Sequence, residues 1–145
     1  YMSTLSTSNR KYHHGDLRRA LVEAGLQLIA EGPADVLSLR ELARQVGVSA
    51  TAVYRHFPDK AALLAALSAE GLAMLGSAQR AAFEAAGGGV RGFAATGAAY
   101  VRFALANSAL FRLTFQHPAP SDLMSRAEGA PDAMGFLLAN ARAYA

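Results

Sequence analysis

Side chains that can donate hydrogen bonds gather between residues 54 and 60 of the chain. Tyr54, Arg55, His56 and Lys60 follow one another at close spacing. Each can bind a phosphate oxygen, and the planar guanidinium of Arg55 can instead bind the edge of a guanine. The residue types and their spacing therefore point to hydrogen bonding with phosphates and bases.

A short helix from Ala50 to His56 is expected to carry these side chains. Ser49 is a plausible N-cap, and Val53 and Phe57 are apolar anchors. With Val53 facing inward, Thr51 becomes the best candidate for a contact to a base edge or a thymine methyl group.

A second short helix comes directly before this one. Ser38 and Glu41 have the spacing of a capping box, and Gly47 ends the helix after barely two turns. Its expected buried stripe is Leu39, Leu42, Ala43 and Val46. Two short helices joined by a tight glycine-containing turn are the helix-turn-helix arrangement, here from about Ser38 to Phe57. In it the second helix lies in the major groove, while the first helix and the flanks hold phosphates.

The predicted DNA interface combines side chains of different roles. Small residues at Ala50 and Ala52 let the helix backbone approach closely, and Arg40 can add a phosphate contact. The residues predicted to bind DNA are Arg40, Ser49, Ala50, Thr51, Ala52, Tyr54, Arg55, His56 and Lys60.

The remaining elements are also expected to be helices. β-branched residues are scattered without alternation, whereas alanine, leucine and arginine recur at helical spacing, which predicts an all-α fold. The first helix opens at Gly15 or Asp16, ends at Gly32-Pro33 and places Leu17, Leu21, Ala24 and Leu28 on one face. Further helices are expected over 60–86, 90–106, 109–116 and 122–126 and from about residue 132 onward, with a loop at 87–89.

The helix over 60–86 is expected to have apolar positions at Leu63, Leu64, Leu67, Met74 and Leu75. The helix over 90–106 is expected to turn Phe93, Gly97, Tyr100 and Ala104 to one side, with Leu105 at the margin. The aromatic residues expected in the core rather than in a pocket are Phe93, Tyr100, Phe103, Phe111 and Phe115. Arg102, Arg112 and His117 could orient an acidic ligand or be surface charges, so no ligand-binding residue is assigned.

Composition narrows the class of protein. The chain has 145 residues, no cysteine and a formal net charge of +3, and its isoelectric point is about 9.6. The lack of cysteine excludes a disulfide framework and fits a cytoplasmic protein. The charge suits an acidic partner without establishing one. Arginines and glycines interrupt the apolar stretches and the N-terminus has no apolar leader, so we expect neither export nor a membrane span.

No residue set predicts an enzyme, a metal centre or a cofactor. We find no nucleophile paired with a base and no suitably spaced carboxylates. His13 and His14 would point about 100° apart on a helix, without a third ligand.

Arg10-Lys11 is either a basic arm that reaches DNA or solvated charge. Met2 is expected to be the native start and Tyr1 an artificial addition, with a processed native N-terminus as the alternative.

The segment from Leu39 to Leu64 resembles the DNA-binding signature of the tetracycline-repressor (TetR) family. Its clearest part is Val53-Tyr-Arg-His-Phe-Pro-Asp-Lys60 followed by Leu63-Leu64, where the family has Tyr-x-His/Tyr-Phe-x-x-Lys and then a leucine pair. Residues 12–21 are similar to a subgroup of that family, and residues 100–115 are similar to its C-terminal domain. The resemblance is strongest over 12–67 and weakest beyond 118.

The resemblance implies an all-helical homodimer that binds double-stranded operator DNA. Residues 10–60 would form the DNA-binding domain, and residues 61–145 a helical domain for effector binding and dimerisation. Tyr54, His56 and Lys60 would hold phosphates, while Thr51 and its neighbours would enter the groove. A small-molecule effector would release the protein, a repressor, from a palindromic operator. The helices that form the family's dimer interface are not evident, so we expect the chain to be truncated or to lack some residues.

Two other hypotheses stay open at this point. In one, the protein binds DNA without a small-molecule effector and is controlled by a protein partner or by its own concentration. The other is a small helical enzyme, which the sequence supports with no catalytic residue set.

Overall fold

The computed structural model describes residues 14–32, 36–117 and 142. In this part of the chain the regular elements are all helical: α1 (His14–Glu31), α2 (Leu39–Val46), α3 (Ala50–His56), α4 (Lys60–Ala85), α5 (Gly89–Ala106) and α6 (Ser108–Gln116). The prediction of an all-α fold is confirmed. The expected helix over 122–126 and, apart from residue 142, the one from 132 onward lie outside the described residues, as do Arg10, Lys11 and His13.

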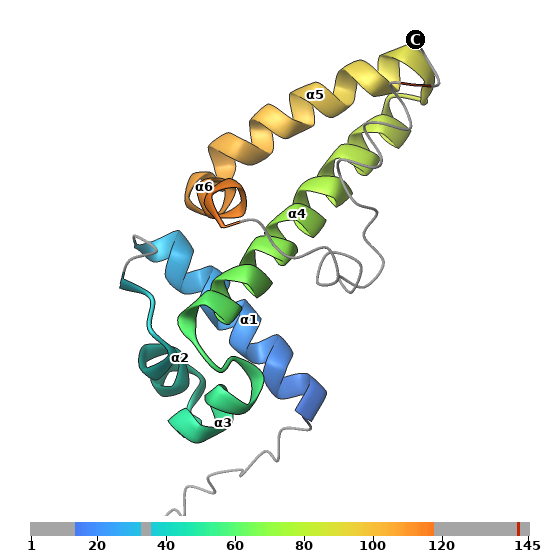
Figure 1. The fold of residues 1–145 in the computed structure, drawn as a ribbon. Coiled ribbons are helices and arrows are strands. Elements are labelled where there is room, and N and C mark those ends of the chain that lie inside the picture. The colour runs from blue at the N-terminus through green and yellow to red at the C-terminus, as the bar shows by residue number, and fades with distance from the viewer. Residues whose placement is uncertain (1–13, 33–35, 118–141, 143–145) are drawn as a thin grey trace, which may run out of the picture.

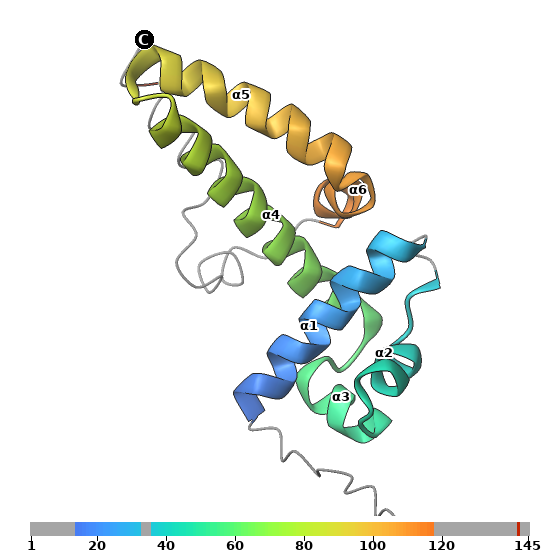
Figure 2. The same cartoon turned by 180° about the vertical axis from the view of Figure 1, so that it is seen from behind.

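The helices form two groups that share α4. Figure 1 shows α1, α2 and α3 gathered at one end of α4, while α5 runs back along the other part of α4. The view from behind shows the same arrangement, with α6 lying across the junction between the two groups (Figure 2). Helix α6 contacts α1, α4 and α5. It therefore connects the C-terminal helices directly to the N-terminal group.

The local stop and start signals in the sequence explain the helix bounds. The Oγ atom of Ser38 accepts a hydrogen bond from the Glu41 amide at 3.1 Å, and Asp59 Oδ1 accepts one from the Ala62 amide at 2.8 Å. Such side-chain acceptors satisfy amides that the first helical turn leaves unpaired. The bounds of α2 and α3 agree with those predicted, and α4 and α5 agree to within one residue at each end.

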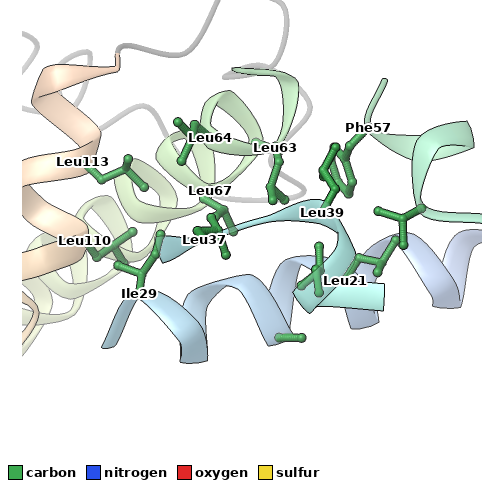
Figure 3. Close-up of a cluster of buried hydrophobic side chains, with 14 of the residues drawn as sticks. Leu21, Ile29, Leu37, Leu39, Phe57, Leu63, Leu64, Leu67, Leu110 and Leu113 are labelled. Atoms are coloured by element: carbon green, nitrogen blue, oxygen red, sulfur yellow. The ribbon is translucent and has the colours of Figure 1, made fainter. Parts of the chain in front are cut away.

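One continuous apolar core joins the two groups of helices. Around the N-terminal helices this core contains Leu21 of α1, Phe57 and Leu63 (Figure 3). Near Ile29 it contains Leu110 and Leu113 of α6. Leu67 of α4 lies between them and is fully buried. Phe57 is a core aromatic with 1% exposure. On α1, Ile29 is fully buried, whereas the predicted Leu28 is only partly buried.

The prediction of the buried face of α5 was wrong by one residue. Its buried residues are Gly92, Thr96, Ala99 and Phe103, which have the predicted spacing but lie about 100° around the helix from the predicted set. Small residues face α4 here, and a Cβ at position 92 would come within 2.7 Å of the Phe83 ring. Close approach of the two backbones therefore decides the face, and Leu105 is 78% exposed.

Two other apolar positions also differ from their predicted core placement. Met74 of α4 is 37% exposed and Phe115 of α6 is 53% exposed. Phe115 still contacts the Phe111 ring, at 4.8 Å between centroids, and Phe111 in turn meets Tyr100 edge to face at 5.4 Å. This chain of aromatic contacts lies at the margin of the core, where Tyr100 and Phe111 are partly buried.

Helix α4 is long and apolar enough to cross a membrane by length and composition alone. Half of its most apolar window is buried inside the molecule, and core helices of soluble proteins meet the same criterion. Its buried residues pack against α1, α5 and α6. The apolar character of α4 is therefore explained by its place between the two groups of helices.

Candidate nucleic-acid interface

The turn between α2 and α3 has a backbone conformation that fixes the relative direction of these two helices. Gly47 has φ +78°, the left-handed region, and its N–H donates to the Ala43 carbonyl at 2.9 Å. The Val48 N–H donates to the same carbonyl at 3.0 Å. Glycine adopts this conformation without the steric penalty that a Cβ atom would bring. The predicted helix-turn-helix geometry is therefore built on local hydrogen bonds.

Three polar residues of α3 lie on one exposed face. Thr51, Tyr54 and Arg55 follow the i, i+3, i+4 spacing that places side chains side by side on a helix. All three are exposed, and Tyr54 shows 46% of its surface. Val53 lies on the opposite side and is fully buried. Val53 thus anchors α3 in the core, and the polar face is directed away from the molecule.

The other predicted residues surround this face with different degrees of exposure. Ala50, His56 and Lys60 are partly buried, and Arg40 near the start of α2 is exposed. Ala52 packs its methyl group against the core, so its small size serves packing as well as access to the backbone. No measurement tests these DNA contacts, and they stay predictions.

Ser49 has a structural role that is compatible with its predicted one. Its Oγ atom accepts a hydrogen bond from the Ala52 amide at 3.2 Å, which caps α3. The hydroxyl can still donate its own proton to a phosphate oxygen, because accepting and donating use different parts of the group. Its contact with DNA would therefore leave the cap in place.

An exposed ion pair on α2 differs in part from the predicted capping box. The Arg44 guanidinium donates to Glu41, with Nε to Oε2 at 3.0 Å. The Glu41 amide donates to the Ser38 hydroxyl, whereas the Glu41 carboxylate pairs with Arg44. Of the two hydrogen bonds that define a capping box, the one from the Glu41 amide to Ser38 is therefore present among the described residues. The hydrogen bond from Arg44, aided by its charge, holds the pKa of the Glu41 carboxyl below its ordinary value.

Arg18 of α1 is a residue that the sequence analysis did not single out. Its Nη1 donates to the His56 carbonyl at 3.4 Å, and its guanidinium carbon lies 4.7 Å from the centroid of the Phe57 ring. No local sequence signal could have indicated this contact, because the partners are 38 residues apart and only the packing of α1 brings them together. Arg18 thus reaches the C-terminal end of the helix that carries the exposed polar face.

The polar side chains on and next to α3 are mostly hydrogen-bond donors. Among the described residues there is no group of three or more His, Asp or Glu side chains placed to hold a metal ion. Arg18 of α1 directs its guanidinium to the His56 carbonyl and the Phe57 ring. The other donors on α3 and at the start of α4 are Tyr54, Arg55, His56 and Lys60. Their chemistry is donation of hydrogen bonds to acceptors, most readily to phosphate oxygens.

Comparison with known proteins places the same segment in a regulatory family. Residues 21–67 match the family model described as bacterial regulatory proteins, tetR family. Sixty residues are 40% identical to the nucleoid occlusion factor SlmA of Marinomonas sp. (strain MWYL1), covering 41% of this chain and 29% of that protein. Forty-three residues are 56% identical to an uncharacterized HTH-type transcriptional regulator of Haemophilus influenzae, covering 29% of this chain and 21% of the relative.

The likeness extends beyond the N-terminal helices in three dimensions. A solved structure of a protein with unknown function from Rhodococcus sp. RHA1 superposes with a TM-score of 0.71 at 36% sequence identity. The superposition covers 92% of this chain and 72% of that one. By contrast, the matches to the two curated relatives span less than a third of the length of either. The architecture is therefore shared well past the segment of high sequence similarity.

Proposed function

Because the chain belongs to the TetR family of bacterial regulatory proteins, we propose that it is a DNA-binding transcriptional regulator that inserts α3 into the major groove of operator DNA. One observation carries the proposal: Thr51, Tyr54 and Arg55 form an exposed polar face on a short helix whose opposite side is anchored by the buried Val53. A helix held in this way can enter a groove about 12 Å wide without moving its core contacts.

Within this proposal the residues divide between sequence recognition and anchoring. Thr51 contacts a base edge or a thymine methyl group, and Arg55 binds a guanine or a phosphate. Tyr54, His56 and Lys60 bind phosphates, and Arg40 adds a further phosphate contact. Ser49, Ala50 and Ala52 allow the start of α3 to come close to the DNA. Base contacts then determine which sequence is bound, and phosphate contacts determine the register.

The proposal extends to repression by a homodimer in the cytoplasm. A two-fold protein reads a two-fold site, so the operator is an inverted repeat whose half-sites lie about one helical turn apart. We place DNA binding in residues 10–60 and assign effector binding and dimerisation to residues 61–145. Helix α6 contacts α1 of the DNA-binding part and α4 of the following part, so it links the two directly. The protein is proposed to act without catalysis and without a cofactor.

Selection of bound sequences from random double-stranded DNA, at one stated salt concentration, tests this function. The expected result is an enriched palindrome for the 145-residue chain and for a control in which the exposed Arg102 of α5 is changed to methionine. The variant Thr51→Ala should select a site relaxed at defined positions. A chain that enriches no sequence, and binds only weakly in a salt-sensitive way, would contradict the proposal.

The operator then allows the two modes of control to be separated. Release of the operator by a small molecule in a compound screen supports effector control. If no compound releases it while operator occupancy simply follows protein concentration, the alternative without an effector holds. The protein released from the operator should retain its helical content, because release requires only a changed spacing of the two recognition helices in the dimer.

A further inference from the structure

One side chain of α1, that of Arg18, makes two different contacts with the C-terminal end of α3. Arg18 donates a hydrogen bond from Nη1 to the His56 carbonyl at 3.4 Å. Its guanidinium also lies over the Phe57 ring at 4.7 Å from the centroid, within the range of a cation–π contact. Phe57 is 1% exposed, so the ring is a fixed surface rather than a mobile one.

Helix α3 needs such an attachment because it is short. It has seven residues, and its buried apolar residue is Val53. A helix leaves its last carbonyls without internal partners, and the positive charge of Arg18 lies where the helix dipole is negative. Helix α1 itself packs against α2, α4 and α6, which makes it a rigid support. The polar face of α3 is thus held by the core on one side and by Arg18 at its end.

The chemistry of the two contacts requires arginine. A planar guanidinium can stack on an aromatic ring and donate in its own plane to a carbonyl at the same time, whereas an ammonium group cannot match both geometries. Arg19, the next residue, is exposed instead and pairs with Glu23 of its own helix at 3.7 Å. Neighbouring cations on α1 therefore have different surroundings, and Arg19 provides a natural control.

We propose that Arg18 is a positioning residue for DNA recognition, holding the end of α3 against α1 so that Thr51, Tyr54 and Arg55 face the groove together. This inference rests on the proposed function. Arg18 acts here through His56 and Phe57 and does not itself bind a phosphate.

The test compares Arg18→Met with Arg19→Met in the full chain, using two measurements. Amide hydrogen exchange of free protein should show residues 53–57 exchanging about tenfold faster in Arg18→Met, with α4 unchanged, since both contacts to the helix end are lost. Operator affinity should fall roughly tenfold to a hundredfold, while the slope of log K against log salt stays that of the wild type. Arg19→Met should leave exchange at residues 53–57 and affinity near wild type.

Several outcomes would overturn the proposal. A salt slope reduced by about one in Arg18→Met would make Arg18 a phosphate ligand. Equal losses of operator affinity in Arg18→Met and Arg19→Met would mean that Arg18 contributes only its charge. Unchanged hydrogen exchange in α3 would mean that Arg18 does not hold the end of this helix. Arg18→Lys covers the case in which Arg18→Met does not fold. This variant should keep the wild-type salt slope of operator binding, but residues 53–57 should still exchange faster than in the wild type. Wild-type exchange in Arg18→Lys would contradict the need for a planar group.

The exchange measurement also separates this proposal from the proposed function. If the wild-type chain selects no operator, the DNA-binding function fails. Faster exchange in α3 of Arg18→Met would then still establish the attachment, while normal exchange with intact operator selection would reject the positioning role alone.

Discussion

Gly71 of α4 lies so close to Thr114 of α6 that a Cβ atom at position 71 would come within 2.5 Å of the Thr114 hydroxyl. That hydroxyl donates to the Leu110 carbonyl at 2.9 Å, and the Thr114 carbonyl accepts from the buried Ser68 hydroxyl at 3.2 Å. The contact joins α4, which follows the helix-turn-helix, to α6, which contacts α1. A methyl group at this point would push the two helices apart.

We therefore expect Gly71→Ala to lower the free energy of unfolding by about 1–3 kcal/mol, the usual cost of overpacking. Urea unfolding provides the measurement. Gly97→Ala is the matched control, because position 97 lies inside α5 with nothing within 4 Å of a Cβ, and there alanine should be neutral or stabilising. Combining Gly71→Ala with Thr114→Ala should recover part of the loss, and a purely additive double variant would argue against the direct clash.

Gly47→Ala should destabilise the turn between α2 and α3 by about 1–2 kcal/mol, because φ is +78° at this position. Gly47→Asn should cost less, since asparagine tolerates the left-handed region better. Gly15→Ala, in open space at the start of α1, serves as the comparison in the same thermal unfolding series. Equal stability of Gly47→Ala and wild type would mean that the turn relaxes at no cost.

Lys60 and Thr51 should affect DNA binding in different ways. Lys60→Met removes a proposed phosphate contact, so affinity should fall similarly for all sequences and the salt slope should drop by about one. Thr51→Ala should instead cost roughly 1–3 kcal/mol at particular bases only. Titrations of operator and single-base variants at several salt concentrations distinguish the two patterns, with Arg102→Met as the control for loss of a remote charge. A sequence-independent loss in Thr51→Ala would refute its place in the groove.

The pKa of Glu41 should lie below the ordinary carboxyl value and return toward it in Arg44→Met, because the hydrogen bond from Arg44 favours the ionised form. The sign follows directly: the pair contributes stability above the ordinary pKa of the carboxyl and loses it as the pH falls through the lowered one. Carbon-detected NMR titration of the Glu41 carboxyl measures this. An identical titration in wild type and Arg44→Met would show that the pair does not persist in solution.

Gln79→Met should leave stability unchanged or raise it by about 1–2 kcal/mol. Gln79 is 1% exposed, and its Nε2 donates to the Thr96 carbonyl at 3.4 Å, whereas its Oε1 is buried without a hydrogen-bond partner. Removing an unsatisfied buried acceptor can offset the loss of one long hydrogen bond. Gln79→Glu should be strongly destabilising at neutral pH, because it buries a charge. A large loss in Gln79→Met would indicate that the oxygen is satisfied after all.

The sequence alone predicted the elements whose signals are local. Ser38 and Ser49 are caps in the structure, and Gly47 ends α2 with a left-handed residue. Each signal acts over three or four residues, so the bounds of α2 and α3 and the exposed face of α3 follow from spacing. The family resemblance likewise depended on consecutive residues.

Only the tertiary structure decided which surfaces meet. The buried face of α5 is shifted by one residue from the predicted one because Gly92 and the other small residues let α4 come close, a choice that apolar periodicity does not encode. The contact of Arg18 with His56 and Phe57 and that of Gly71 with Thr114 join segments distant in sequence. Such contacts arise from the relative positions of packed backbones, which depend on the whole core. Residue types and local spacing therefore determined the helices, and packing determined how α3 is held.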